Sequence, residues 1–219
     1  MADHRSIVAF YEQCLADHGD SFRGVGWTKS QEETDRRYSV MLEIAEPVPS
    51  EGASLIDFGC GAAHLYEYML RTGRGRDLEY IGVDASERFL AIAKSKFPQL
   101  HFLRGDGIDG LPVHADYVIM NGIFTVRADL TQEEMWDYVR RVLRGVYPSA
   151  RRGIAFNVMS KHVDWERRDL FHLPTDVLTG FITRELSRHF IIRHDYGLYE
   201  YTTYVFRSAR TGDESDAGT

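Results

Sequence analysis

Three acidic residues of this 219-residue chain each stand at the end of a short apolar segment. Asp57 lies near the end of the segment 53–58, Asp84 directly follows 78–83, and Asp106 comes shortly after a third such segment. If these segments are parallel strands, their carboxyl ends meet at one edge of a sheet, where open α/β sheets bind ligands. Three carboxylates around one ligand favour a cation and disfavour a phosphate.

The turn after the first segment contains Gly59 and Gly61 on either side of Cys60. Glycines let the chain turn tightly and admit a ligand where a Cβ would block it. The dinucleotide fingerprint Gly-x-Gly-x-x-Gly is incomplete because His64 occupies its last position, and Asp57 would repel a pyrophosphate. A nicotinamide-dependent oxidoreductase is therefore disfavoured. S-adenosylmethionine carries an ammonium and a sulfonium and no phosphate, so it suits this turn better.

With these residues in place, the chain resembles the class I S-adenosylmethionine-dependent methyltransferases over about residues 50–207. Their first motif is apolar-apolar-acid-x-Gly-x-Gly-x-Gly, and here Ala63 replaces the third glycine, which is expected to leave slightly less room near the methionine moiety. The resemblance implies that Asp84 accepts hydrogen bonds from the ribose hydroxyls and Asp106 from the adenine amino group. The cofactor-binding residues it implies are Asp57, Gly59, Cys60, Gly61, Asp84, Ala85, Asp106, Gly107, Ile108 and Asn121.

The segments after the fourth and fifth expected strands are candidates for the catalytic and acceptor side. Asn121 follows the fourth strand, where its side chain can face the adenosine or the transferred methyl; a turn-forming Asn-Gly is the alternative. His162, with Asp164 nearby, is the candidate general base for a hydroxyl acceptor, and a solvated loop histidine is the alternative. The residues expected to contact the acceptor are Tyr11, Trp27, Phe124, Asn157 and Tyr199.

The pattern of the chain alternates between strand-like and helical segments from residue 53 to 188. This alternation predicts a doubly wound, mostly parallel sheet with helices on both faces. A seventh strand and a closing antiparallel hairpin, formed by 190–194 and 201–206, are taken from the resemblance. We expect residues 1–49 to form a helical cap segment, 50–207 to form the methyltransferase domain, and 208–219 to be a disordered tail.

The composition of the chain limits which classes of binding partner are compatible with it. The formal net charge is −7 and the isoelectric point about 5.7, which disfavours a nucleic-acid partner. So does the segment after Asn121, which lacks the Asn/Asp-Pro-Pro-aromatic motif of enzymes that methylate nucleic-acid bases or protein glutamines. Two cysteines are too few for a disulfide framework, and no His/Cys cluster indicates a metal. With no apolar segment long enough to span a membrane, we expect a cytoplasmic protein, monomeric or homodimeric.

The sequence thus predicts an enzyme that methylates an O or N atom of a small molecule, such as a specialised metabolite or a sugar. A non-catalytic regulator or scaffold that binds S-adenosylmethionine or a nucleotide is the alternative from another class. Retention of all three acids and both glycines disfavours it.

Overall fold

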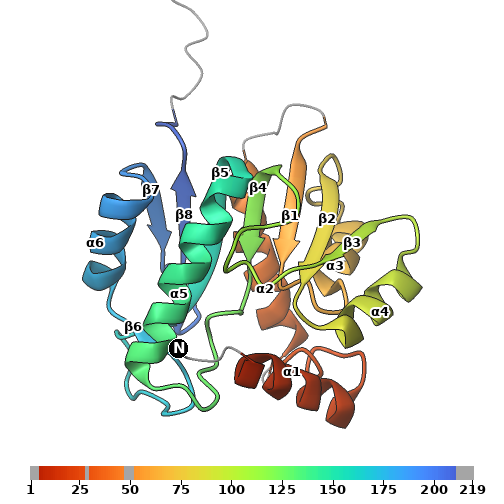
Figure 1. Cartoon of the computed structure of the whole chain (residues 1–219), viewed down its shortest axis with the longest axis horizontal. Coiled ribbons are helices and arrows are strands. Elements are labelled where there is room, and N and C mark those ends of the chain that lie inside the picture. Colours follow the sequence, from red (N-terminus) through yellow and green to blue (C-terminus); the bar gives the residue numbers. More distant parts are fainter. Residues whose placement is uncertain (1–4, 28–29, 47–51, 211–219) are drawn as a thin grey trace, which may run out of the picture.

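The computed structural model describes residues 5–27, 30–46 and 52–210, and its centre is one mixed β-sheet (Figure 1). The strands run in the order β3-β2-β1-β4-β5-β8-β7, and a short β6 pairs with β5 outside this path. Their bounds are β1 Ser54–Phe58, β2 Glu79–Asp84, β3 His101–Arg104, β4 Ala115–Met120, β5 Ala150–Ser160, β6 His172–Leu173, β7 Phe190–Arg193 and β8 Glu200–Phe206.

The predicted sheet is confirmed, including its closing hairpin. Strands β1 to β5 pair in parallel, whereas β8 lies antiparallel to both β5 and β7. The two-residue β6, parallel to β5, lies in the segment between β5 and α6. Two residues are too few to show any periodicity, so the sequence could not have indicated it.

The strand order reverses between β1 and β4, which puts the switch point of the sheet beside Asp57. All five residues of β1 are buried, because helices cover both of its faces. This double burial explains why the strand is nearly all apolar and makes its one acid conspicuous. In doubly wound sheets, ligands bind at the carboxyl ends of the strands beside such a reversal.

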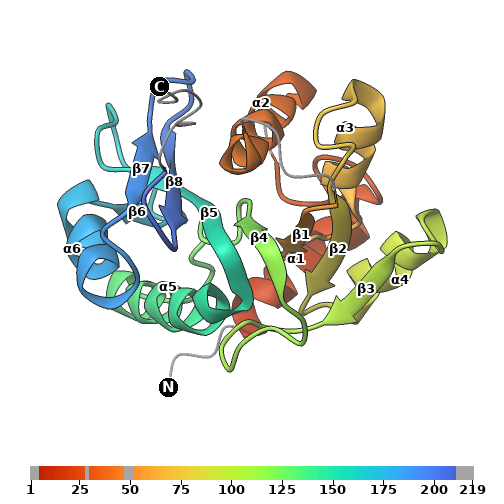
Figure 2. The ribbon, with the colours of Figure 1, turned by 90° about the horizontal axis from the view of Figure 1, so that it is seen from above.

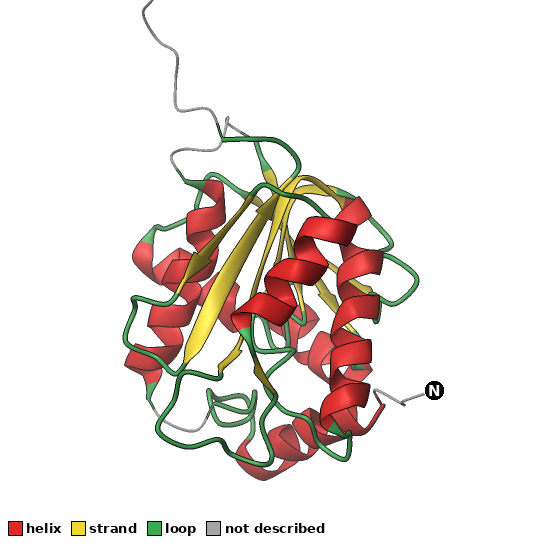
Figure 3. Cartoon of the chain, turned by 90° about the vertical axis from the view of Figure 1, so that its left-hand side faces the viewer, coloured by secondary structure: helices red, strands yellow, loops and turns green. Residues whose placement is uncertain are grey.

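The described residues form six α-helices. Their bounds are α1 Arg5–His18, α2 Gln31–Leu42, α3 His64–Thr72, α4 Glu87–Lys96, α5 Gln132–Val146 and α6 Thr175–Glu185. Helices α2 and α3 lie on one face and α5 and α6 on the other, with the sheet between them (Figures 2 and 3). The buried side chains accordingly form two clusters, one on each face. A capping box begins α5, since Thr131 and Glu134 satisfy each other's backbone N–H groups.

Helix α1 has a different position from the other helices. It crosses the carboxyl ends of the parallel strands and packs on neither face of the sheet (Figure 1). Of the residues of α1 only Ile7 is buried, and Phe10 is 39% exposed. The Tyr11 hydroxyl donates to the Gly122 carbonyl oxygen at 3.0 Å, which ties α1 to the end of β4. The apolar face of α1 therefore borders the ligand-binding edge of the sheet.

A short stretch after α1 holds this region onto the glycine turn. Asp20 lies 2.7 Å from the His64 ring nitrogen Nε2 and 2.9 Å from the Lys96 ammonium. Val25 lies against the position that a Cβ at Gly61 would take. No helix in the described ranges is both long and apolar enough to cross a membrane.

Candidate active site

A cavity of about 440 Å³ opens at the carboxyl ends of the parallel strands, between the glycine turn, α1 and the segment after β5. Its size is in the range of small-molecule sites. Eleven of the predicted site residues line it: Asp57, Gly59, Cys60, Gly61, Asp84, Ala85, Asp106, Asn121, Tyr11, Trp27 and Tyr199. The structure therefore brings the three acids and the glycine turn to one cavity.

Asp57 is the most deeply buried of the three acids. Its Oδ2 accepts a hydrogen bond from the Tyr80 hydroxyl at 2.8 Å. The pKa of the Asp57 carboxyl is raised to about 7, chiefly by burial; the hydrogen bond from Tyr80 lowers it and the charge of Asp84 raises it. A cation in the cavity would favour the ionised form, so Asp57 is a suitable counter-charge for a cationic ligand.

Asp84 fixes the glycine turn to the end of β2. One carboxylate oxygen accepts from the Gly61 backbone N–H and the other from the Ser86 backbone N–H, each at 2.8 Å. Burial raises the pKa of Asp84. Each carboxylate oxygen has a second lone pair, so Asp84 can accept further hydrogen bonds from a ligand.

The glycine turn owes its shape to left-handed backbone conformations. Gly59 has φ +80°, and a Cβ there would lie 2.3 Å from the Ile123 Cγ2 atom. Ala63, in place of the third glycine of the motif, also has a left-handed φ of 62°. It is fully buried and is not part of the cavity lining, so the expectation that it narrows the cavity was wrong. The substitution instead places a non-glycine residue in a conformation that costs about 1–2 kcal/mol.

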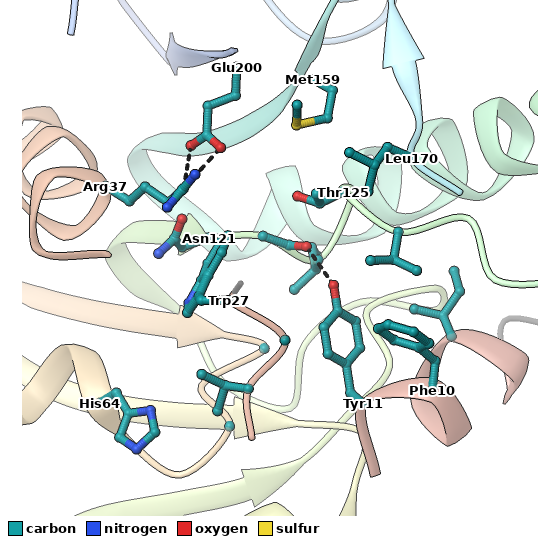
Figure 4. Close-up of a pocket in the computed structure, with 18 of the residues that line it drawn as sticks. Phe10, Tyr11, Trp27, Arg37, His64, Asn121, Thr125, Met159, Leu170 and Glu200 are labelled. Atoms are coloured by element: carbon teal, nitrogen blue, oxygen red, sulfur yellow. Dashed lines mark hydrogen bonds and ion pairs between the residues drawn. The ribbon is translucent and has the colours of Figure 1, made fainter. Parts of the chain in front are cut away.

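On the other side of the cavity, Glu200 joins three elements. Its carboxylate accepts from the Arg37 Nε at 3.0 and 2.9 Å and from the Asn157 Nδ2 at 2.8 Å, although only 2% of its side chain is exposed. The Arg37 guanidinium lies over the Trp27 ring, 4.4 Å from its centroid (Figure 4). This chain of contacts holds Trp27 beside Gly122 at the end of β4.

Asn157 was expected to contact the acceptor, and this was wrong. Its side chain is fully buried and is not part of the cavity lining. Both ends of the amide are engaged, since Oδ1 accepts from the Gly122 N–H at 2.7 Å while Nδ2 donates to Glu200. Asn157 therefore positions the chain after β4 from behind the cavity.

Three further predicted residues also lie outside the lining. Phe124 is fully buried, where its ring makes edge contacts with Tyr138 and Phe156, so it cannot reach an acceptor. Gly107 packs against Phe58 behind the cavity wall, and Ile108 packs against the same core cluster. In this loop Asp106 alone reaches the cavity, and its Oδ1 accepts from the Ile108 N–H at 3.1 Å.

His162 was expected to act as a general base in the cavity, and its position does not fit this role. Its side chain is exposed and does not line the cavity, and its backbone N–H donates to the Ser160 Oγ. His172, on the short β6, lines the cavity instead. Its Nδ1 lies 2.7 Å from the Ser160 carbonyl oxygen, and its Nε2 accepts from the Arg167 N–H at 3.2 Å. Both ring nitrogens are therefore engaged with the backbone, which suits a structural role and leaves no lone pair for a substrate proton.

Two polar atoms in the cavity wall have no hydrogen-bond partner in the described part of the chain. They are the Asn121 Oδ1 at the end of β4 and the Thr125 Oγ1 four residues later. A buried polar atom without a partner costs about 1–3 kcal/mol. Both residues line the cavity, so a ligand there can supply the missing partners.

Several lining residues carry no signal in the sequence. Arg37 and Glu200 are far apart in the chain and meet only in the folded structure. Thr125 and His172 lie in segments without a recognisable motif. His64, by contrast, could be noticed in the sequence because it stands where the dinucleotide fingerprint has its last glycine. Among the described residues, no group of three histidine, cysteine or acidic side chains could hold a metal ion.

Comparison with known proteins identifies the family. Residues 55–145 match a family model described as a methyltransferase domain. Rv1506c of Mycobacterium tuberculosis, a protein named as a methyltransferase, is 30% identical over 161 residues, which cover 71% of this chain and 94% of that protein. The chain belongs to the class I S-adenosylmethionine-dependent methyltransferases.

Several solved structures of other proteins have a fold similar to that of this methyltransferase. The magnesium protoporphyrin IX methyltransferase of Synechocystis, crystallised with S-adenosylmethionine, gives a TM-score of 0.63 at 16% identity over 95% of this chain and 99% of that one. The mitomycin 7-O-methyltransferase gives 0.59 at 12% identity over 90% of this chain and 60% of that one. At these identities the likeness is one of fold. The Rossmann-like methyltransferase fold is thereby confirmed.

Proposed function

We propose that this methyltransferase transfers the methyl group of S-adenosylmethionine to an O or N atom of a small-molecule acceptor. The observation that carries the proposal is the convergence of Asp57, Asp84 and Asp106 on one cavity beside the glycine turn. The same cavity is also lined by Phe10 on α1, Met159 on β5 and Leu170 in the following segment (Figure 4), and we call the part between these residues its acceptor half. One half suits the cofactor, and the other has room for an acceptor.

The residues present fit the cofactor in charge and in hydrogen bonding. We assign Asp84 to the ribose hydroxyls, Asp106 to the adenine amino group, and Asp57 to the cationic methionine end. The unpartnered Asn121 Oδ1 supplies a further acceptor at the junction of the two halves. When bound, the cofactor supplies a methyl group on a positively charged sulfur. The chain's own contribution is to hold both reactants in line and to exclude water.

Asn121 is the residue that we assign to the reacting centre. It stands at the end of β4, directly beside the switch point, and lines the cavity between its two halves. Because His172 has both ring nitrogens occupied, we assign it no role as a base, and alignment and desolvation of the acceptor are the proposed sources of the rate enhancement. Residues 1–49 would act as a cap, since α1 and the stretch after it border both halves.

The decisive experiment follows the methyl group itself. The protein is incubated with S-adenosylmethionine that carries a labelled methyl and with a panel of small molecules, and both labelled products and S-adenosylhomocysteine are quantified. The proposal predicts acceptor-dependent release of S-adenosylhomocysteine with label in the small molecule. Tight cofactor binding without turnover on a broad panel would instead support the non-catalytic regulator.

A further inference from the structure

The acceptor half of the cavity has apolar walls. One wall comes from the exposed side of α1, with Phe10 and Tyr11, and the opposite wall comes from Met159 on β5 and Leu170 in the following segment (Figure 4). Such walls favour a ligand that buries apolar surface, because each Å² removed from water is worth about 25 cal/mol. A sugar, with a hydroxyl on nearly every carbon, would lose hydration here and gain few hydrogen bonds.

Exposed aromatic rings surround the same half. Within the described ranges, all the large aromatic side chains that are exposed line this cavity: Phe10 at 39%, Trp165 at 72% and Tyr199 at 51%. Large exposed hydrophobic side chains elsewhere in those ranges are aliphatic. The three rings come from separate parts of the chain, namely α1, the segment after β5 and the approach to β8. Exposed rings gathered at one mouth offer flat apolar faces on which a ring-shaped ligand can stack.

The positive charges of the two arginines in the lining are paired with carboxylates. Both lining arginines have carboxylate partners, Arg37 with Glu200 and Arg167 with Asp169, where the Arg167 Nε donates to Asp169 Oδ1 at 3.1 Å. The described lining contains no lysine. A phosphorylated or sulfated acceptor would therefore meet no unpaired arginine or lysine to balance its charge, whereas a neutral acceptor needs none.

A polar atom without a hydrogen-bond partner lies among these apolar residues. The Thr125 Oγ1 has no hydrogen-bond partner in the described structure, and Figure 4 shows it on the side of Thr125 that faces away from Leu170. The Thr125 backbone is fixed at both ends, by a bond from its N–H to the Gly122 carbonyl and one from the Phe171 N–H to its own carbonyl. The hydroxyl is thus held in place and can serve a polar atom of the acceptor.

On the basis of the proposed function, we propose that the acceptor is a neutral, flat, largely apolar molecule, namely an aromatic ring system with a hydroxyl or amino group. Its rings stack against Phe10 and Trp165, and Thr125 hydrogen-bonds to one of its polar atoms. This inference separates two acceptor classes that the sequence left open, because it selects an aromatic metabolite over a sugar.

The test measures binding with three probes: a neutral aromatic ring system, the phosphate ester of that ring system, and a neutral sugar. Protein saturated with S-adenosylhomocysteine is titrated in a calorimeter with 2-naphthol, with 2-naphthyl phosphate and with methyl α-glucoside. We expect 2-naphthol to bind at least about tenfold more tightly than either other probe. Tighter binding of the phosphate or of the glucoside would overturn the proposal.

Variants with matched controls test the placement. Trp165→Ala and Thr125→Val should each weaken 2-naphthol binding about three- to tenfold while S-adenosylhomocysteine binds as before. Leu70→Ala removes an exposed aliphatic side chain outside the cavity, and Thr203→Val removes another unpartnered buried hydroxyl away from it, so both should bind 2-naphthol normally. Unchanged 2-naphthol affinity in the Trp165 and Thr125 variants would contradict the placement. Failure of S-adenosylhomocysteine itself to bind would contradict the proposed function instead, and titration of the ligand-free protein would still decide the acceptor class.

Discussion

Replacing Asp57 with asparagine tests the electrostatics of the cavity without changing the shape of the side chain. The pKa of this carboxyl rises from 3.8 to about 7 on folding, chiefly through burial. Between these values the folded protein binds more protons than the unfolded chain, so the contribution of Asp57 to stability falls as pH rises. With 1.36 kcal/mol per unit of pKa, wild-type protein should lose about 2–3 kcal/mol of unfolding free energy between pH 5 and pH 8 through this one group.

Asp57→Asn removes that loss, since the amide does not ionise and can still accept from the Tyr80 hydroxyl. Urea unfolding of both ligand-free proteins is followed by circular dichroism from pH 5 to pH 8. The unfolding free energy of the variant relative to wild type should increase as pH rises. Asp116→Asn is the control of opposite sign, because hydrogen bonds from Ser54 hold the pKa of Asp116 below its usual value. Its ionised form stabilises the fold, so that variant should lose stability near neutral pH. Parallel pH profiles for wild type and Asp57→Asn would refute the reasoning.

Two further pairs of variants test the turn and the histidines. Gly73→Ala, at φ +74° with no atom near the new Cβ, should cost about 1–2 kcal/mol of unfolding free energy, whereas Gly59→Ala should cost about 1–3 kcal/mol more and also impair cofactor binding, because its Cβ meets Ile123. Equal losses in urea unfolding would contradict this. His162→Ala should leave stability and turnover unchanged, and His172→Ala should lower stability by about 1–3 kcal/mol by leaving two backbone groups unpaired. Loss of turnover in His162→Ala alone would restore that histidine as a base.

The fold and the cofactor half could be predicted because their signals are local. A buried parallel strand is apolar on both faces, so Asp57 stands out in its segment, and the Ser30, Ser86 and Thr131 caps mark where helices begin. Each acid also follows its own strand at a short distance. Because the carboxyl ends of parallel strands lie at one edge of the sheet, the strand assignment alone predicts that the three acids lie close together.

The acceptor half could not be predicted in the same way. Its contacts join residues that are distant in the chain, such as Arg37 with Glu200, and no sequence pattern in either segment indicates that the two residues form an ion pair. In this half, the polarity of a residue also did not indicate whether its side chain points toward the cavity. His162 is polar and faces solvent, Asn157 is polar and buried behind the wall, and the hydroxyl that faces the cavity belongs to Thr125, in a segment without a motif.

The central claim is that the acids at the strand ends hold the cofactor, and calorimetric titration with S-adenosylhomocysteine tests it most directly. Wild-type protein should bind, and Asp84→Asn should bind about 10- to 150-fold more weakly, which corresponds to the 1.5–3 kcal/mol of hydrogen bonds to a charged group. Asp116→Asn, at the opposite end of the sheet, should bind like wild type. Equal affinity of wild type and Asp84→Asn, or no binding to a folded wild type, would contradict the account.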